Sequence, residues 1–238
     1  MRRLLLAVLA GALYSIPALA DRDRLEANLA AVLPAGAEPP VIAESPMEGV
    51  YEVTLDGRTF YAMAQERFVL LGEVYDAQRR VSLSEERQAA RMATQIDNLQ
   101  IDDMVVFGPA DAKRHITVFT DVDCGYCRKL HSEVPQLTDA GLQVRYLAFP
   151  RAGIGSSSYD KLVSVWCADD QQQAMTTAKA GRSIESRSCE NPVADQYQLG
   201  QSVGVRGTPT LVFDDGTIVP GYLPAQALLA KVGLSPAQ

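Results

Sequence analysis

A pair of cysteines two residues apart constrains this chain more than any other feature of its sequence. Cys124 and Cys127 lie in VFTDVDCGYCRKLHSEV, residues 118–134, after an apolar run and before a polar run that is typical of a helix. Cysteines at this spacing bind zinc, hold an iron cluster or act as a redox dithiol. A helix N-terminus stabilises a thiolate through its free N–H groups and its dipole. We therefore predict a dithiol, with Cys124 exposed and nucleophilic and Cys127 more buried.

Zinc is the main alternative for the cysteine pair. Cys124, Cys127 and His131 supply three possible ligands, whereas a structural zinc site needs four. His115 is the only other histidine, and its spacing does not suit a fourth ligand. We therefore expect no metal and no cofactor. His131 falls on the same helix face as Cys124, two turns along. We expect it to be a surface histidine, and electrostatic tuning of the thiol is the alternative.

Strands and helices alternate from residue 104 onwards. Strands are expected at 104–108, 115–121 and 144–150, a hairpin at 210–220, and helices from Cys124 to Gly141, within 157–203 and at 224–233. A strand that leads into a CxxC at a helix start, with a later hairpin and helix, is the thioredoxin arrangement. We predict a thioredoxin-like α/β catalytic domain at 104–238, with a helical insertion in its middle.

Gly207, Thr208 and Pro209 directly precede the last hairpin. In thioredoxin-like folds a proline at this place follows a cis peptide bond and lies beside the reactive cysteine. We expect the same here, because a cis bond would expose the backbone of Thr208 for strand-like pairing with a substrate chain. On their own, these residues indicate only a turn before a strand.

Cys167 and Cys189 are the other two cysteines of the chain. Four cysteines allow three pairings. The close pair most easily bonds to itself, which leaves Cys167 with Cys189. Closing a loop of that length removes chain entropy worth roughly 3 kcal/mol from the unfolded state. Two free buried thiols are the alternative, against which an oxidising compartment argues.

The first twenty residues, MRRLLLAVLAGALYSIPALA, have the features of a signal peptide. Arg2 and Arg3 precede an apolar stretch too short to span a bilayer, and Ala18-Leu19-Ala20 fits the small-x-small cleavage rule. We predict cleavage after Ala20 and a periplasmic location; an uncleaved anchor is the alternative. The net charge of −7 becomes −9 without the two arginines, so nothing suggests nucleic-acid binding.

Residues 21–80 are typical of a small, mainly antiparallel unit. A short helix at 22–33 precedes a hairpin at 49–64 and a further strand at 67–76. The hairpin contains Asp56-Gly57, a pair favoured in tight turns. A unit of this size has little core of its own, and its apolar edge strand invites pairing with a second chain. We predict an N-terminal dimerisation domain.

The longest clear helix is SLSEERQAARMATQIDNL, residues 82–99. Ser82 and Glu85 fit a capping box at its start. Apolar residues are scattered among charges, so we expect the helix to be largely solvated. We predict that residues 81–103 form a linker helix between the domains. The alternative is an ordinary surface helix of one of them.

The chain resembles the DsbC/DsbG family of periplasmic disulfide isomerases through nearly all of 104–223. The segments in family order are FTDVDCGYCRKLH, VRYLAFPR, VWCADD, YQLGQSVGVRGTPTLVF and DGTIVPGY. CGYC is fairly specific, since thioredoxins usually carry CGPC and DsbA-type oxidases CPHC. One departure from thioredoxin is Val118, which stands where thioredoxin has a buried Asp. Proton transfer from Cys127 therefore depends on some other group.

The resemblance implies a V-shaped homodimer, α+β overall. It is joined through cystatin-like N-terminal domains and has two active sites facing an apolar cleft. It also implies that the membrane reductase DsbD keeps the dithiol reduced. The expected partners are misoxidised or unfolded periplasmic proteins, which the cleft would bind as a chaperone does.

The expected reaction starts when Cys124 attacks a wrong disulfide. The freed substrate thiol then attacks elsewhere, which is isomerisation, or Cys127 resolves the complex, which is reduction. Gly125, Tyr126, Thr208 and Pro209 are the expected substrate-binding residues. Two alternatives are a DsbG-like reductase of sulfenylated cysteines and a holdase chaperone whose cysteines are incidental.

Overall fold

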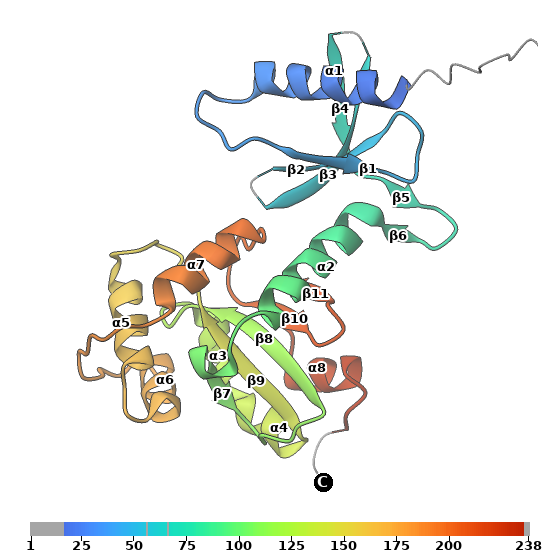
Figure 1. Cartoon of the computed structure of the whole chain (residues 1–238). Helices are drawn as coiled ribbons and strands as arrows, with labels where there is room; N and C mark the ends of the chain where they lie inside the picture. Colours follow the sequence, from blue (N-terminus) through green and yellow to red (C-terminus); the bar gives the residue numbers. More distant parts are fainter. Residues whose placement is uncertain (1–16, 56, 66, 236–238) are drawn as a thin grey trace, which may run out of the picture. The chain divides into compact units, whose positions relative to one another are not determined.

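The computed structural model describes residues 17–55, 57–65 and 67–235 and divides into two compact units (Figure 1). Apart from the turn at 56–59, the N-terminal unit ends at Val74 and the C-terminal unit begins at Tyr75. Most of the predicted signal peptide, residues 1–20, lies outside the described residues, as does Asp56 of the predicted turn. No helix in the described ranges is long and apolar enough to span a bilayer.

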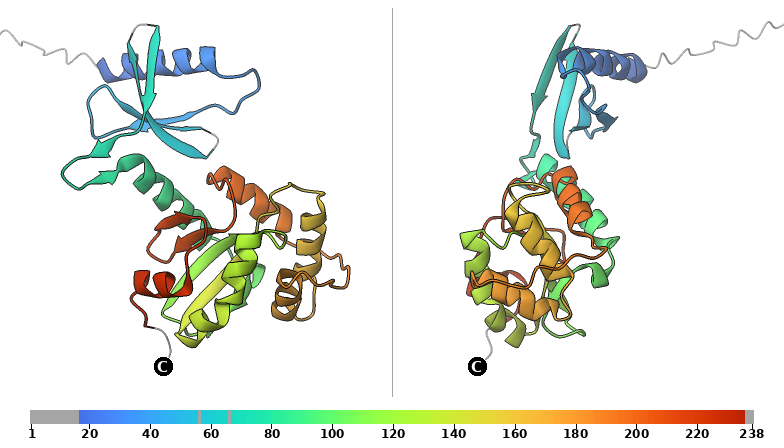
Figure 2. Two further views of the ribbon diagram at one scale, coloured as in Figure 1. Left: turned by 180° about the vertical axis from the view of Figure 1, so that it is seen from behind. Right: turned by 90° about the vertical axis from the view of Figure 1, so that its left-hand side faces the viewer.

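The N-terminal unit is a helix packed on an antiparallel sheet (Figure 2). Its elements are α1 (Pro17–Val32), β1 (Val41–Glu44), β2 (Tyr51–Leu55), β3 (Arg58–Gln65) and β4 (Phe68–Gly72), and the strand order is β1-β2-β3-β4. Leu25 and Leu29, one helical turn apart, are buried against Ile42, Tyr51 and Val53 of the sheet. The hairpin and the strand after it agree with the sequence prediction, whereas β1 was not predicted.

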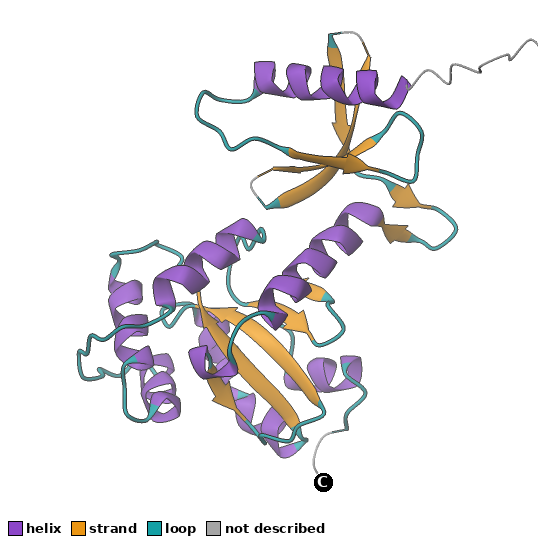
Figure 3. Ribbon diagram, viewed as in Figure 1, coloured by secondary structure: helices purple, strands orange, loops and turns teal. Residues whose placement is uncertain are grey.

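The C-terminal unit is a mixed sheet covered by helices (Figure 3). Its strands are β7 (Val105–Phe107), β8 (Arg114–Thr120), β9 (Leu142–Ala148), β10 (Thr210–Phe213) and β11 (Ile218–Pro220), in the order β11-β10-β8-β9-β7. Only the β8–β9 pairing among these is parallel. The short strands β5 (Tyr75–Asp76) and β6 (Val81–Ser82) pair with each other before this sheet. This is the predicted thioredoxin-like fold.

The helices of the C-terminal unit include the predicted insertion between β9 and β10. The α-helices are α2 (Leu83–Asp97), α3 (Gly125–Ser132), α4 (Val134–Asp139), α5 (Ser157–Trp166), α6 (Gln171–Lys179), α7 (Val193–Ser202) and α8 (Ala225–Lys231); a 3₁₀ turn, η1, spans Ile101–Asp103. The insertion consists of α5, α6 and α7. Within it, the Asn191 side chain accepts a hydrogen bond from the backbone of Val193 at the start of α7.

Strand β8 positions the cysteine pair because it is central and buried on both faces. Val118 belongs to the larger core cluster of this unit, whereas its neighbour Phe119 belongs to a second cluster on the other face of the sheet. The strand ends at Thr120, and helix α3 begins five residues later at Gly125. Loops at the carboxyl ends of parallel strands commonly carry the functional groups of an α/β sheet.

Helix α2 is less solvated than its sequence suggested. Met92 is 1% exposed and Ile96 is 5% exposed, and both pack into the cluster that contains Phe119 and Val203. Gln88 donates a hydrogen bond to the Val203 carbonyl at 3.2 Å. The prediction of a largely solvated helix is therefore wrong for this face. The linker role of residues 81–103 stays a prediction.

The predicted capping of α2 is present. Ser82 is the N-cap residue, and its hydroxyl accepts a hydrogen bond from the Glu85 backbone N–H at 3.3 Å. Such a bond satisfies one of the free N–H groups of the first turn. The start of this helix could therefore be read from local sequence alone.

The long helix expected after the cysteine pair is divided. Helix α3 ends at Ser132, and α4 begins at Val134 with Pro135 in its first turn. Proline lacks the N–H that would continue the hydrogen bonds of the preceding helix, so it favours a new helix start. The carboxylate of Glu133, at the break, accepts hydrogen bonds from the Tyr222 hydroxyl and the Ala225 backbone.

Candidate active site

Cys124 lies at the N-terminus of α3, as predicted. It is the N-cap residue, and its carbonyl accepts the first helical hydrogen bond from Arg128. Its exposure differs from the prediction, because Cys124 is 3% exposed and Cys127 is 1% exposed. The expectation of an exposed Cys124 is wrong. The thiol donates a hydrogen bond to the Thr208 carbonyl at 3.2 Å, and this contact from a distant loop covers the sulfur.

The loop that covers Cys124 carries the predicted cis peptide bond between Thr208 and Pro209. Hydrogen bonds anchor this loop on both sides. The Thr210 hydroxyl donates to the Gly207 carbonyl at 2.8 Å, and the Gly221 N–H donates to the Pro209 carbonyl at 2.8 Å. The structure therefore brings Thr208 and Pro209 to the cysteine pair across more than 80 residues of sequence.

The pKa of the Cys124 thiol is lowered from 9.0 to about 4. The largest cause is a hydrogen bond from Cys127, and a hydrogen bond from the Thr208 side chain and the charge of Arg151 act in the same direction, against burial. The Thr208 hydroxyl is buried without another partner among the described residues, so it is free to donate to the thiolate. These contacts favour the thiolate form of Cys124 over the thiol.

The pKa of Cys127 shifts in the opposite direction. Burial raises it most, and the hydrogen bond to the Cys124 thiolate raises it further. Opposite shifts are expected when two thiols share one proton, because the donor of the hydrogen bond must keep its hydrogen. One buried sulfur is thus held as a nucleophile, and its neighbour as a thiol that must lose a proton before it can react.

Asp121 organises the loop between β8 and α3. Its carboxylate is 2% exposed and accepts from the Asp123 N–H at 2.8 Å, and from both the backbone and the guanidinium of Arg151 at 2.9 and 3.1 Å. The ion pair holds a positive charge near Cys124, where it favours the thiolate. Neither residue was singled out from the sequence.

Lys179, at the end of α6, is a third residue of this site that sequence reasoning missed. It is 3% exposed, and its ammonium donates to the Thr120 hydroxyl at 2.5 Å and to the Asp121 carbonyl at 3.0 Å. Burial lowers its pKa from 10.5 to about 8, although nearby negative groups oppose the shift. A lysine in the last turn of a helix ordinarily faces solvent near the negative end of the dipole, so the sequence carries no signal for this burial.

His131 also differs from its prediction. It is 7% exposed, and its two ring nitrogens lie 3.0 Å from the Tyr146 hydroxyl and 3.1 Å from the Thr176 hydroxyl. Burial, together with the charge of Lys179, lowers its pKa to about 4. The expectation of a surface histidine is wrong, because the insertion helix α6 covers this face of α3. No cluster of three or more His, Cys, Asp or Glu that could hold a metal occurs among the described residues.

The residues between the cysteines form part of an exposed surface beside the active site. Tyr126 is 65% exposed and stacks on Tyr222, with ring centroids 6.1 Å apart. The ammonium of Lys129 lies 4.6 Å from the centre of the Tyr222 ring. A Cβ added at Gly125 would have open space within 4 Å, so the backbone beside Cys124 is accessible from this side.

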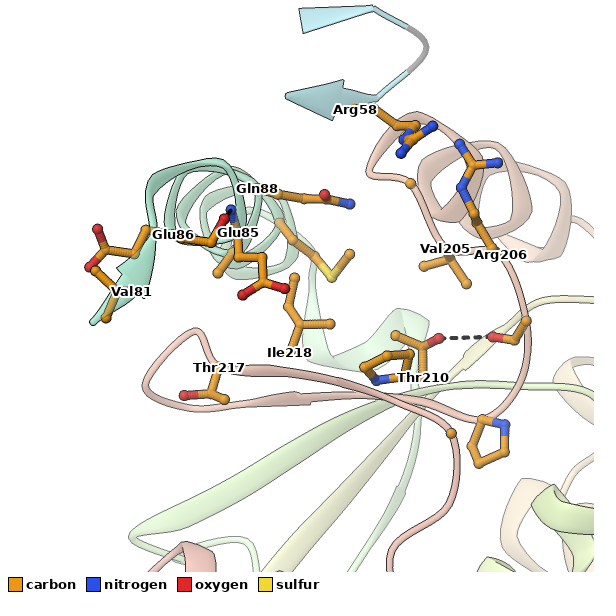
Figure 4. A pocket seen from close by; sticks show the side chains of 18 of the residues that line it. Arg58, Val81, Glu85, Glu86, Gln88, Val205, Arg206, Thr210, Thr217 and Ile218 are labelled. Atoms are coloured by element: carbon orange, nitrogen blue, oxygen red, sulfur yellow. Dashed lines mark hydrogen bonds between the residues drawn. The ribbon is translucent and has the colours of Figure 1, made fainter. Parts of the chain in front are cut away.

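A groove lies beside the Thr208–Pro209 loop (Figure 4). Its lining includes Glu85 and Gln88 of α2, together with Val205, Thr210 and Ile218, which Figure 4 labels. Thr208 and Pro209 line the groove, but neither cysteine does. An occupant of this groove would therefore contact the Thr208–Pro209 loop without contacting either cysteine.

Cys167 and Cys189 form a disulfide within the insertion. It joins the end of α5 to the loop before α7, with Cα atoms 5.7 Å apart and 22 residues of separation. The bond ties together a segment whose loop, residues 182–190, has no regular structure. Cys124 and Cys127 are free thiols.

Comparison with known proteins shows which families the two parts of the chain match. Residues 102–233 match the family described as "Thioredoxin-like domain", and residues 17–85 match the "Disulfide bond isomerase protein N-terminal domain". The chain is 35% identical over 221 residues to the Thiol:disulfide interchange protein DsbC of Salmonella typhimurium, covering 93% of this chain and 91% of that protein.

The chain belongs to the DsbC family. A second DsbC relative, from Escherichia coli K12, is 35% identical over 187 residues, which cover 79% of this chain and 78% of that protein. A solved disulfide interchange protein from Neisseria gonorrhoeae has 30% identity and a TM-score of 0.50, and the match covers 56% of this chain and 97% of that one. The two family matches together support a thioredoxin-like domain preceded by a DsbC-type N-terminal domain.

Proposed function

We propose that this protein is a thiol–disulfide oxidoreductase that isomerises incorrect disulfides in folding proteins. The observation that carries the proposal is the pairing of a low-pKa sulfur with a high-pKa sulfur at one helix N-terminus. The pKa of Cys124 is lowered to about 4, whereas that of Cys127 is raised above its ordinary value. A thiolate that forms at neutral pH is the nucleophile that thiol–disulfide exchange needs.

Cys124 is the attacking residue in the proposed reaction. Its thiolate attacks a substrate disulfide, forms a mixed disulfide and releases one substrate sulfur as a thiolate. That thiolate can attack another disulfide of the substrate, and a substrate thiolate finally displaces Cys124, which completes an isomerisation. Alternatively, Cys127 loses its proton and attacks Cys124, which releases a reduced substrate and leaves the pair oxidised.

The substrate chain would lie along the Thr208–Pro209 loop. The Thr208 carbonyl lies 3.2 Å from the Cys124 sulfur, and the space beside Gly125 is open. An extended peptide pairs with exposed backbone groups largely irrespective of its side chains, which suits a protein that must accept many unfolded substrates. The exposed ring of Tyr126 adds apolar contact area beside Cys124.

The proposed assembly is a homodimer formed through the N-terminal unit. Strand β4 is at one edge of its sheet, and Phe68, Leu70 and Leu71 on it are 62%, 65% and 51% exposed. An edge strand with apolar side chains is a ready site for pairing with a second copy. Dimerisation would place two active sites in one molecule, as in the proposed chaperone-like capture of unfolded chains.

The proposed location is the periplasm, after removal of residues 1–20. Oxidising surroundings favour the Cys167–Cys189 disulfide of the structure. In such surroundings the Cys124–Cys127 dithiol would become oxidised unless a reductant restores it, and the membrane reductase DsbD is the proposed electron donor. Misoxidised or unfolded periplasmic proteins are the proposed substrates.

Two single substitutions test the proposed function. Cys127→Ala removes the resolving thiol, so reduction of a disulfide substrate should fall to background. Refolding of a scrambled multi-disulfide protein should persist at a lower rate, because the substrate's own thiol can release Cys124. Cys124→Ala should abolish both activities, since no low-pKa sulfur remains.

These assays, together with measurements of sulfenic-acid reduction and of aggregation, separate the alternatives. Equal and complete loss in both variants would contradict direct isomerisation and favour cycles of reduction and reoxidation. A protein that reduces sulfenylated cysteines but leaves scrambled disulfides unchanged would be a reductase of the DsbG type. Suppression of aggregation that survives alkylation of Cys124, in the absence of any refolding activity, would indicate a holdase.

A further inference from the structure

The proton of Cys127 has no obvious acceptor in this site. Cys127 is 1% exposed, and burial raises the pKa of its thiol. Val118, which is fully buried, occupies the position on β8 where thioredoxin has a carboxylate. Water cannot easily reach a thiol at this depth, so a protein group must take the proton before Cys127 attacks a mixed disulfide.

The nearby acidic and imidazole groups are already engaged. Asp121 accepts hydrogen bonds from the Asp123 N–H and twice from Arg151, so its carboxylate oxygens are already occupied by these donors. Both ring nitrogens of His131 are occupied by the Tyr146 and Thr176 hydroxyls. Neither group is placed to accept a proton from Cys127 without losing these bonds.

Lys179 and Cys127 converge on the same two groups. The Lys179 ammonium donates to the Thr120 hydroxyl and to the Asp121 carbonyl. The Thr120 side chain and the Asp121 backbone also form hydrogen bonds that act on Cys127, and the charge of Lys179 favours its thiolate. With an ammonium, the Thr120 hydroxyl accepts from Lys179 and can donate to a Cys127 thiolate; with a neutral amine, it can accept from the Cys127 thiol and donate to Lys179.

The titratable and charged groups that face Lys179 come from each element packed against it. From α3 these are Cys124, Cys127, Arg128 and His131; from the loop after β8, Asp121; and from β9, Tyr146, whose ring centre lies 5.7 Å from the ammonium. The two sulfurs and Asp121 favour the charged lysine, and Arg128 and burial oppose it. In a mixed disulfide the Cys124 charge is absent, which makes the neutral amine easier to form.

We propose that Lys179 accepts the proton of Cys127 when the mixed disulfide is resolved, taking the place of the carboxylate that this fold lacks here. This inference rests on the proposed function, because it concerns the second step of that reaction.

The proposed step balances in protons and electrons. The neutral Lys179 amine takes the proton of Cys127 through Thr120 and becomes an ammonium, leaving a Cys127 thiolate. The thiolate forms a bond to the Cys124 sulfur and breaks the bond between Cys124 and the substrate. The electron pair leaves with the substrate sulfur, which is thereby reduced, while Cys124–Cys127 is oxidised. The ammonium then returns its proton to the substrate thiolate or to water.

Lys179→Met tests the proposal because methionine fills a similar volume without charge or basicity. The mature protein is reacted with a fluorescent peptide disulfide under single-turnover conditions. Formation of the mixed disulfide is measured separately from release of the peptide thiol between pH 6 and 10. Lys161→Met is the matched control, since Lys161 is an exposed lysine that pairs with Asp123 near the site.

The two steps should respond differently. Mixed-disulfide formation should change by less than about threefold, whereas release at pH 7 should slow by about tenfold or more, the effect of one pKa unit. The wild-type release rate should rise with a midpoint at or below the Lys179 pKa of about 8, and the variant's midpoint should move to higher pH. The control should match the wild type in both steps.

The outcomes separate the two proposals. Failure of the wild type to form a mixed disulfide at Cys124 would overturn the proposed function. Normal formation with an unchanged release rate and pH midpoint in Lys179→Met would overturn only the role of Lys179. If the methionine variant does not fold, Lys179→Gln is measured in the same way, since it keeps a hydrogen-bond donor. A wild-type release midpoint above pH 9 would overturn the role without any variant.

Discussion

The two units of this molecule differ in how far each can stabilise itself. In the described part of the N-terminal unit, the buried core is limited to a few side chains of α1 and the sheet, such as Leu25 and Val53, while apolar residues of β4 remain exposed. The C-terminal unit has buried clusters on both faces of its sheet. Small cores give marginal stability.

This difference fits a proposed division of labour, with chemistry in the C-terminal unit and assembly in the N-terminal unit. The chemistry needs sulfur atoms held in fixed positions, and a large core provides rigid support for them. Assembly needs an apolar surface that a partner can cover, and a small sheet with an open edge provides one. In this proposal, the exposed apolar residues of the N-terminal unit serve assembly, and the buried charged residues of the C-terminal unit serve the chemistry.

The largest expected effect comes from the exposed edge of the N-terminal sheet. Leu70→Glu should prevent dimerisation, because a charge cannot be buried in an apolar interface without a partner. We expect a monomer in sedimentation and an isomerase rate lower by at least about tenfold, since the gain from two linked sites is lost. Reduction of a small peptide disulfide should be unchanged.

Val41→Glu is the matched control for that substitution. Val41 is 67% exposed on β1, at the opposite edge of the same sheet. It should leave the dimer intact. Dimerisation of Leu70→Glu, or equal effects of both substitutions, would show that β4 is not the interface and would break the proposed division of labour.

A second prediction compares two fragments of the C-terminal unit. A fragment from Tyr75 keeps α2, whereas one from Ile101 lacks Met92 and Ile96 of the second core cluster. Each of these side chains contributes about 1.5–3 kcal/mol when buried, so the shorter fragment should be less stable by about 3–6 kcal/mol in denaturant unfolding. Both should be monomers that reduce a peptide disulfide. Equal stability would mean that α2 is only a linker.

A third prediction concerns the insertion. Replacing both Cys167 and Cys189 by Ser should lower the free energy of unfolding by about 3 kcal/mol, because the unfolded chain gains loop entropy. The thiolate absorbance of Cys124 should titrate as in the wild type, since the disulfide lies in the α5–α7 segment. A changed Cys124 titration would show that the insertion controls the active site as well as stability.

The last prediction is the pH dependence that His131 gives to the C-terminal unit. Its pKa is about 4 in the folded protein and near 6.5 when unfolded, so the unfolded state binds protons first. The stabilisation of the folded state by neutral His131 is fully present above pH 6.5 and is lost as the pH falls towards 4. The loss is about 3 kcal/mol, which corresponds to a difference of 2.5 pKa units between the two states.

Comparison with His131→Gln isolates this contribution. Because glutamine cannot be protonated, the unfolding free energy of the fragment from Tyr75 with His131→Gln should decline less between pH 7 and 4. The same fragment with His131 should lose more stability over this range. Both histidines of the chain lie in this unit, so the N-terminal unit should lack this dependence. Parallel pH profiles for the two fragments would contradict a buried neutral His131.

Sequence reasoning succeeded where the signal was local. The strand before Cys124, the helix start at the cysteine pair and the Ser82 cap each depend on a few adjacent residues, and each is present in the structure. It failed where a distant segment decides the environment. Cys124 was expected to be exposed, but the loop at Thr208 covers it, and His131 was expected at the surface, but α6 covers it.

The sequence by itself determined the chemistry and the fold class of this protein. A CxxC motif at a helix start selects thiol chemistry because spacing and the helix terminus are local properties. Only the tertiary structure decided that both sulfurs are buried and that Lys179 lies near Cys127. The pKa shifts of Cys124, Cys127 and Lys179 arise from the contact between the two cysteines, from burial and from contacts between segments more than 50 residues apart. Electrostatic interactions depend on distance in space and on exclusion of water, and neither can be read from the order of residues.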